Sequence, residues 1–225
     1  KGGDIIILYA LKALKENGLL NNAQIIVAFT GDEESTGKPL EISRKHLIDA
    51  AKRSDVALCF ETSTGFNYAT VARRGSSGWK VEVEGKRAHS SGIFNENTGA
   101  GAIFEMSRIL NSFYNEVRGE DYLTFNPGVV LGGTAVNFDE TMNVVAQTAV
   151  VDGGLRFISE EQKENARNKM KTIVASNLPK TSAKISFTDS YPAMEATEGN
   201  YRLLNTLNQV SLDLKQGGVK AYDPG

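Results

Sequence analysis

The stretch "IIVAFTGDEESTG", residues 25–37, places an apolar run directly before three consecutive acids, Asp32, Glu33 and Glu34. A short continuous apolar run that ends in turn residues is typical of a strand buried on both faces. Such strands belong to mostly parallel sheets that helices cover on both sides. The stretch therefore predicts an α/β fold with carboxylates at the end of a buried strand.

The residues around this stretch repeat the same alternation of helix and strand. Apolar residues at helical spacing predict helices over 4–20 and 38–54, and continuous apolar runs predict buried strands over 23–30 and 55–62. Glu61 stands at the end of the second strand. Ligands of open α/β sheets gather outside the carboxyl ends of the strands, so four acids at one edge indicate a functional site.

The pattern changes after residue 75. Residues 77–86 alternate apolar and polar side chains, as a strand with one solvated face does. The segments that follow predict the order β-α-β-β-α-β, the ferredoxin-like order, over 77–86, 97–117, 127–138, 142–158, 159–178 and 183–190. A helix near 199–216 and a strand at 218–222 predict a return to the first domain. We therefore expect three segments: 1–75 in a first domain, 76–190 as an inserted domain, and 191–225 in the first domain again.

Composition narrows the class of function. The chain has 225 residues and a net charge of -2, so it offers no basic field for a nucleic acid or an anionic membrane. No apolar run reaches the roughly 18 residues that a membrane-spanning helix needs. The single cysteine, Cys59, excludes an internal disulfide, and its apolar neighbours predict a buried structural thiol.

The acids after residue 31 have two interpretations. In hydrolytic metal sites one carboxylate holds the ion and a neighbour takes a proton from water. Alternatively, all three acids cap the following helix and complement its dipole. Glu61 at the end of the next strand favours the metal site, and oxygen ligands without histidine would by themselves favour Mg²⁺, Mn²⁺ or Ca²⁺ over Zn²⁺.

Histidine is scarce, and neither of the two has the paired spacing of a zinc motif. His46 lies on the polar side of a predicted helix and reads as a surface residue. His89, in "GKRAHSSG", follows a strand of the inserted domain, where a structural role and a role at a site are both open.

The motifs resemble those of the di-zinc exopeptidases that include glutamate carboxypeptidase, aminoacylase and succinyl-diaminopimelate desuccinylase. The resemblance follows the order of the chain through the segments "KGGDIIILYALKALKENG", "FTGDEESTG", "DVALCFETSTG", "EGKRAHSSG" and "NVVAQTAVVDGGLRF". It implies a mostly parallel-sheet zinc-peptidase domain with an inserted ferredoxin-like lid, which commonly forms the dimer contact. We therefore expect a homodimer and a small peptide or N-acyl amino acid as substrate.

The resemblance also implies roles for the acids. Glu33 matches the general base that deprotonates a water shared by two zinc ions. Glu34 and Glu61 match zinc ligands, one for each ion.

Three residues of the inserted domain match positions that contact substrate. His89 matches the lid histidine that stabilises the tetrahedral intermediate, often in the site of the partner subunit, as an oxyanion-hole donor does. Asn143 and Arg156 match positions that hold substrate, and an arginine fork suits a terminal carboxylate. The segment "VDGGLRF" has one residue more than the usual D-x-R of the family.

The departures from the family pattern indicate a fragment. The bridging aspartate would lie two residues before Lys1, and neither the upstream H-x-D histidine nor the late histidine is present. Two of five protein ligands remain, which predicts a truncated and inactive chain in a zinc enzyme rather than a site for another metal. The alternative is a non-catalytic dimerisation or peptide-binding module derived from the same fold.

Overall fold

The computed structural model describes residues 2–61, 65–133, 143–222 and 224, in two compact units, 1–66 and 67–225. In order, the described elements are α1 (Gly2–Glu16), α2 (Leu40–Ser43), α3 (Lys45–Ala51), β1 (Tyr68–Thr70), β2 (Gly75–Gly85), η1 (Ser90–Gly92), α4 (Ala102–Ser112), η2 (Phe113–Val117), β3 (Thr124–Gly133), β4 (Thr148–Phe157), α5 (Glu160–Ala175), β5 (Thr181–Asp189), α6 (Glu198–Asp213) and β6 (Lys220–Tyr222). None of these helices is both long and apolar enough to cross a bilayer.

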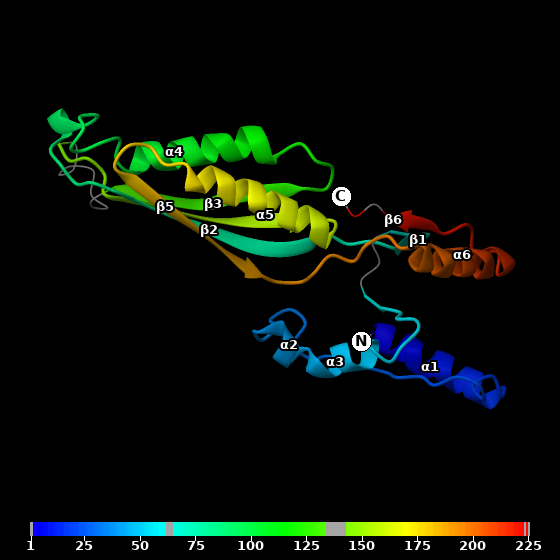
Figure 1. The fold of residues 1–225 in the computed structure, drawn as a ribbon. Coiled ribbons are helices and arrows are strands. Elements are labelled where there is room, and N and C mark those ends of the chain that lie inside the picture. Colours follow the sequence, from blue (N-terminus) through cyan, green and yellow to red (C-terminus); the bar gives the residue numbers. More distant parts are fainter. Residues whose placement is uncertain (1, 62–64, 134–142, 223, 225) are drawn as a thin grey trace. The chain divides into compact units, whose positions relative to one another are not determined.

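The larger unit contains a four-stranded antiparallel sheet in the order β3-β4-β2-β5. With α4 between β2 and β3 and α5 between β4 and β5, this is the β-α-β-β-α-β arrangement that the sequence predicts. Figure 1 shows both helices on the same face of the sheet. The ferredoxin-like fold is confirmed; the part of the predicted strand over 134–138 lies outside the described residues.

The core of this unit lies between the sheet and the two helices. Alternate residues of β2, from Gly75 to Val83, are buried, because successive side chains of a strand point to opposite faces. Among them, Trp79, Val81 and Val83 belong to one core cluster with apolar side chains of α4 and α5. Ile109 and Met170 of this cluster are both fully buried. Burying one such side chain stabilises the fold by roughly 1.5–3 kcal/mol.

Trp79 explains the first glycine, Gly153, in "VDGGLRF". Its register partner on β4 is Gly153, and a Cβ added there would lie closer than 3.0 Å to the indole ring and to the backbone oxygen of Asn126 on β3. The indole Nε1 donates to the backbone oxygen of Gly154 at 3.1 Å. Gly153 is therefore needed because the tryptophan ring occupies the space of its side chain.

Two short strands bring distant parts of the chain together. β1 and β6 pair in parallel, with Tyr68 opposite Lys220 and Thr70 opposite Tyr222. The rings of Tyr68 and Tyr222 meet edge to face, with centroids 6.3 Å apart. Helix α6 precedes β6, and the side chain of Thr197 caps its first turn by accepting from the backbone N–H of Asn200.

The smaller unit differs from the sequence prediction. Its described residues form no strand over 23–30 or 55–61, and the expected helix over 38–54 is two short helices, α2 and α3. A strand needs neighbours that pair with its backbone groups, and no described segment pairs with these two. Their apolar side chains are exposed, among them Phe29 and Leu58, and Cys59 is exposed rather than buried.

Candidate functional site

The acidic loop after residue 31 is held by Arg44. The guanidinium of Arg44 forms an ion pair with the carboxylate of Asp32 through Nη1 and Oδ1. Through Nη2 it donates to the backbone oxygen of Asp32 at 3.0 Å and to Thr36 Oγ1 at 2.8 Å. Arg44 is 7% exposed and lies between α2 and α3, so the break between these helices coincides with the anchor of the loop.

Arg44 also distinguishes Asp32 from the two glutamates that follow it. Its hydrogen bond to Asp32 lowers the pKa of that carboxyl below its ordinary value, with a further contribution from the charge of the guanidinium. Asp32 is thus a structural carboxylate. The side chains of Glu33 and Glu34 are exposed and have no hydrogen-bond partner in the described part of the chain.

The helix-cap interpretation of these acids is wrong. Helix α2 has Pro39 at its N-cap position and no side-chain capping bond, and α3 likewise has none at Arg44. The only acid in the first turn of α2 is Glu41. The exposed carboxylates of Glu33 and Glu34 therefore serve no capping role in the structure.

The described residues do not form a complete metal site. Glu34 and Glu61 offer carboxylate oxygens, which are suitable ligands for zinc. No group of three or more His, Cys, Asp or Glu residues comes together within the described ranges 2–61, 65–133 and 143–222. A zinc site needs three or four protein ligands, so the carboxylates described here fall short of one.

His89 lies in a tightly bonded loop beyond the end of β2. The backbone N–H of Ser90 donates to the backbone oxygen of Asn143 at 2.9 Å, and that of Val145 donates to the oxygen of Ala88 at 2.9 Å. His89 itself forms an isolated antiparallel bridge with Val144. Histidine and asparagine, 54 positions apart in the sequence, are therefore brought side by side, and both are exposed.

Arg156 lies at the other end of the sheet. It is on β4 opposite Ser76, at the start of β2, whereas the first residue of β4, Thr148, pairs with Glu84 near the end of β2. At about 3.3 Å per residue, the strand separates Arg156 from the His89 loop by roughly 25 Å. One copy of the chain thus places His89 and Asn143 together and Arg156 far from both.

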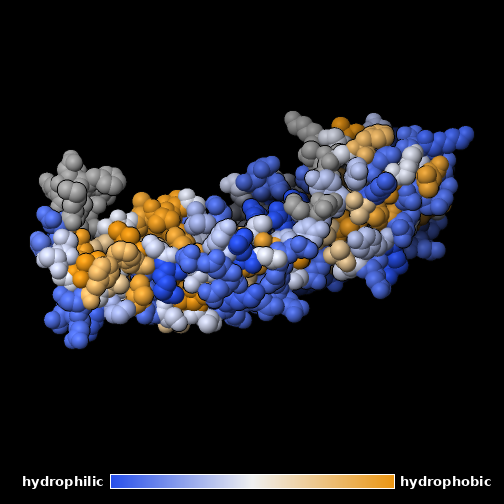
Figure 2. Space-filling model, turned by 90° about the horizontal axis from the view of Figure 1, so that it is seen from above, coloured by the Kyte–Doolittle hydropathy of each residue, from blue (hydrophilic) through white to orange (hydrophobic). Residues whose placement is uncertain are grey.

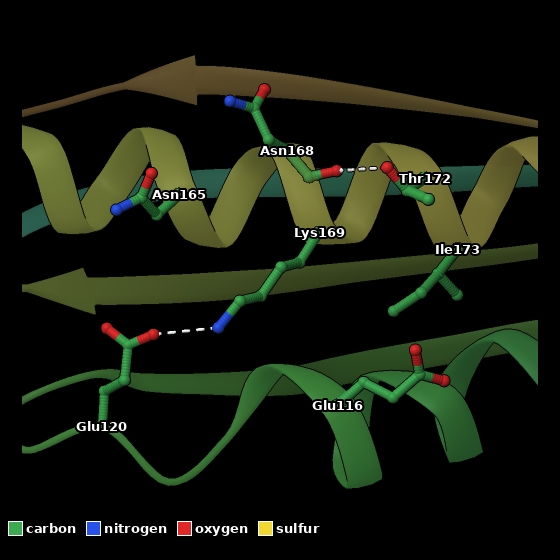
Figure 3. Close-up of a pocket in the computed structure, with 7 residues that line it drawn as sticks. All are labelled: Glu116, Glu120, Asn165, Asn168, Lys169, Thr172 and Ile173. Atoms are coloured by element: carbon green, nitrogen blue, oxygen red, sulfur yellow. Dashed lines mark hydrogen bonds and ion pairs between the residues drawn. The ribbon is translucent and has the colours of Figure 1, made fainter.

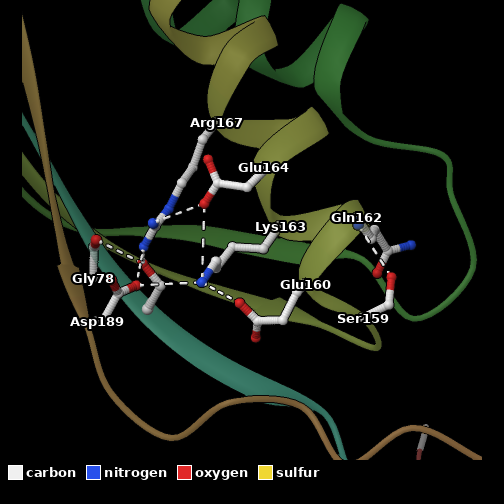
Figure 4. Close-up of polar contacts among 9 residues, drawn as sticks. Gly78, Ser159, Glu160, Gln162, Lys163, Glu164, Arg167 and Asp189 are labelled. Carbon is white, nitrogen blue, oxygen red and sulfur yellow. Dashed lines mark hydrogen bonds and ion pairs between the residues drawn. The ribbon is translucent and has the colours of Figure 1, made fainter.

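A polar network joins α5 to the start of β2 and the end of β5 (Figure 4). Arg167 donates to Ser77 Oγ at 2.6 Å, pairs with the carboxylate of Asp189, and stacks over the ring of Phe187. Arg167 lowers the pKa of Asp189, mainly through its hydrogen bond. Sequence spacing did not reveal this network, because Ser77 and Arg167 are 90 residues apart.

Two grooves lie on the described part of the larger unit, and neither is lined by an expected site residue. A groove of about 590 Å³ lies between α5 and the segment after η2, and Figure 3 shows Lys169 reaching across it to Glu120, at 2.9 Å. An apolar groove of about 260 Å³ lies over Trp79 and Phe113. Both belong to the α5 and α4 face of the ferredoxin-like unit and are separate from the acidic loop in the sequence.

Known proteins resemble the chain along most of its length. Residues 71–182, about half of the chain, match the sequence profile of the peptidase dimerisation domain, M20_dimer. Carboxypeptidase G2 of Pseudomonas sp. (strain RS-16) is 29% identical over 210 residues, which are 91% of this chain and 47% of that protein.

Solved structures share the fold. The aminopeptidase PepT of Bacillus cereus ATCC 10987 superposes with a TM-score of 0.71 at 18% identity, over 99% of this chain and 56% of that one. The aminobenzoyl-glutamate utilization protein of Klebsiella pneumoniae superposes with a TM-score of 0.53 at 16% identity, over 78% and 45% of the two chains. The chain spans about half the length of these relatives. Residues 71–182 thus match the peptidase dimerisation domain, and the chain is similar to carboxypeptidase G2 over most of its length.

Proposed function

We propose that the chain is part of a zinc-dependent metallopeptidase or amidohydrolase that cleaves the amide bond of an N-acyl amino acid or a small peptide. The observation that carries the proposal is the similarity to carboxypeptidase G2, which extends over 91% of the chain rather than over the dimerisation domain alone. The division of the chain at 75/76 and 190/191 into a catalytic segment, a lid and a returning catalytic segment is part of the same proposal.

Glu33 is the proposed general base. A base must be able to approach the attacking water, and Glu33 is exposed while its neighbour Asp32 is held by Arg44. Glu34 and Glu61 are the proposed metal ligands. Because these two carboxylates do not complete a zinc site, we propose that the 225-residue chain is inactive without further ligands.

The three lid residues His89, Asn143 and Arg156 would act on one substrate from two copies of the chain. A small substrate cannot contact His89 and Arg156 of the same copy, because roughly 25 Å of strand separates them. In the proposed homodimer, Arg156 of one copy binds a substrate carboxylate, while His89 and Asn143 of the other copy approach the reacting carbonyl. The guanidinium would provide a bidentate contact, and the imidazole would donate to the oxyanion.

The surface of the lid suits a second copy as partner. β3 is an edge strand, and its residues Val129, Val130 and Leu131 are exposed, the last to 67%. Ile103 and Phe104 of α4 are exposed as well, and Figure 2 shows apolar side chains at the surface around this helix. An exposed apolar edge strand readily pairs with another strand, so we propose that β3 and α4 form the homodimer contact.

The experiment that tests the proposed function is a hydrolysis assay on the longer protein that contains this chain. N-acyl amino acids and dipeptides, including glutamyl amides, are each incubated with the zinc-loaded protein, and the released amine is measured. The proposal is supported if the protein hydrolyses one of these substrate classes and if a chelator abolishes the hydrolysis.

The alternative is a dimerisation or peptide-binding module without metal chemistry, which the lack of a complete metal cluster among the described residues favours. Binding of a peptide without any release of amine from the whole panel would support this alternative and reject the enzyme.

A further inference from the structure

His89 has an asymmetric set of hydrogen bonds. Its Nδ1 lies 3.3 Å from the backbone nitrogen of Ser91 and 2.8 Å from Ser91 Oγ. Within the described part of the chain, the ring is bonded through Nδ1 alone. The imidazole also caps the short helix η1, whose first turn supplies the N–H of Ser91.

The backbone N–H fixes the direction of the first bond. An amide N–H can only donate, so Nδ1 accepts and cannot carry the proton of the neutral ring. The hydroxyl of Ser91 can donate to the same nitrogen. The proton of neutral His89 is therefore on Nε2, and that N–H is left available to a ligand.

We propose that Ser91 is a positioning residue that holds His89 in the Nε2–H tautomer and so makes it a hydrogen-bond donor rather than an acceptor at its exposed nitrogen. Neighbouring bonds from Ser90 to Asn143 and from Val145 to Ala88 fix the backbone on either side of the histidine. The ring is thus oriented by its own loop before any substrate binds.

The chemical consequence rests on the proposed function. A carbonyl oxygen gains negative charge when an amide is attacked, and a fixed N–H aimed at it stabilises that charge. The opposite tautomer would present a lone pair to the oxyanion and repel it. Ser91 therefore deepens the proposed role of His89 without contacting substrate itself.

Long-range ¹H–¹⁵N NMR of the ¹⁵N-labelled chain tests the tautomer directly. The chain has two histidines, and a His46→Gln variant assigns the signals of His89. The spectrum is recorded at about pH 8, above the ordinary histidine pKa of about 6.5. We expect a protonated Nε2 and an unprotonated Nδ1; a ring protonated mainly on Nδ1 would overturn the inference.

Substitutions separate the two bonds from Ser91. Ser91→Ala keeps the backbone N–H and removes the hydroxyl, and we expect the tautomer ratio to move about two- to tenfold toward Nδ1–H, the loss of one ordinary hydrogen bond. Ser91→Thr should restore the ratio. Ser90→Ala makes the same chemical change one residue away and should leave the ratio as in the wild type. An unchanged ratio in Ser91→Ala would reject the role of the hydroxyl.

A kinetic measurement in the longer protein separates this inference from the proposed function. Ser91→Ala should lower kcat while KM stays nearly constant, because the oxyanion bond forms in the transition state. If no substrate is hydrolysed but the Nε2–H tautomer is found, the proposed function fails and the tautomer assignment stands. If hydrolysis is found and Nδ1 carries the proton, the inference fails alone.

Discussion

Gly153→Ala should destabilise the ferredoxin-like unit, whereas Gly154→Ala should not. A methyl group at 153 would lie closer than 3.0 Å to two atoms of the Trp79 ring and to the backbone oxygen of Asn126. At 154, nothing lies within 4 Å. The two glycines are adjacent on β4, and neither requires a positive φ, so they form a matched pair.

The expected loss of stability depends on how far the ring of Trp79 can move away from the added methyl group. Trp79 is 2% exposed and is held by its bond to Gly154 and by edge-to-face contact with Phe113, so the ring has little room to shift. Overpacking a rigid core costs about 1–3 kcal/mol, and a clash with the backbone of β3 favours the upper part of that range. Each kcal/mol lowers Tm by roughly 2–4 °C for a chain of this size. Alanine at 154 should change stability little, or raise it slightly through lower chain entropy.

Tryptophan fluorescence measures the effect at its source. Trp79 is the only tryptophan, so a urea titration followed by its emission reports unfolding of this unit. The midpoint for Gly153→Ala should fall clearly below those of the wild type and Gly154→Ala. Equal midpoints for both variants would refute the claim that the ring occupies the side-chain space of residue 153.

Two further predictions concern charge and association. Arg167 lowers the pKa of Asp189, so the ion pair stabilises the fold above the ordinary aspartate pKa of about 3.9 and loses this contribution as pH falls through the lowered value. Asp189→Asn should therefore reduce the urea midpoint at neutral pH, and the difference between its midpoint and that of the wild type should shrink below about pH 4. A difference in midpoint that does not change with pH would contradict this prediction. An equal effect of the control Asp121→Asn would contradict it as well. Leu131→Lys places a charge on the edge strand β3 and should convert the dimer into a monomer, as measured by sedimentation velocity. The control Ser182→Lys, on the opposite edge strand β5, should leave the dimer intact. If Leu131→Lys remains a dimer, β3 is not the dimer contact.

The ferredoxin-like unit could be predicted from the sequence because its signals are local. Alternation in β2 and the amphipathic patterns of α4 and α5 each specify one element, and their order specifies the fold. The strands predicted over 23–30 and 55–62 are absent from the described residues 23–30 and 55–61, for the opposite reason. An apolar run shows that a segment could be buried, but a strand also needs paired neighbours, and the described residues supply none.

The candidate site was only partly accessible to sequence reasoning. The acids after residue 31 could be recognised in the sequence. Spacing alone could not show that Asp32 forms an ion pair with Arg44, twelve residues after it, and is therefore not a candidate base or metal ligand. The pairing of His89 with Asn143 depends on a loop contact between distant segments. The double glycine at 153 and 154 looked like a departure from the family pattern, whereas Gly153 makes room for the ring of Trp79.

Turnover by Glu33→Gln in the zinc-loaded longer protein tests the central claim most directly. The substitution removes the proposed base and keeps the shape of the side chain, and Glu41→Gln on α2 is the matched control, since both glutamates are exposed in the same unit. We predict that Glu33→Gln retains its zinc, measured by mass spectrometry, and loses at least a factor of about 10² in kcat, the usual contribution of a general base. Unchanged turnover with full zinc content would contradict the account.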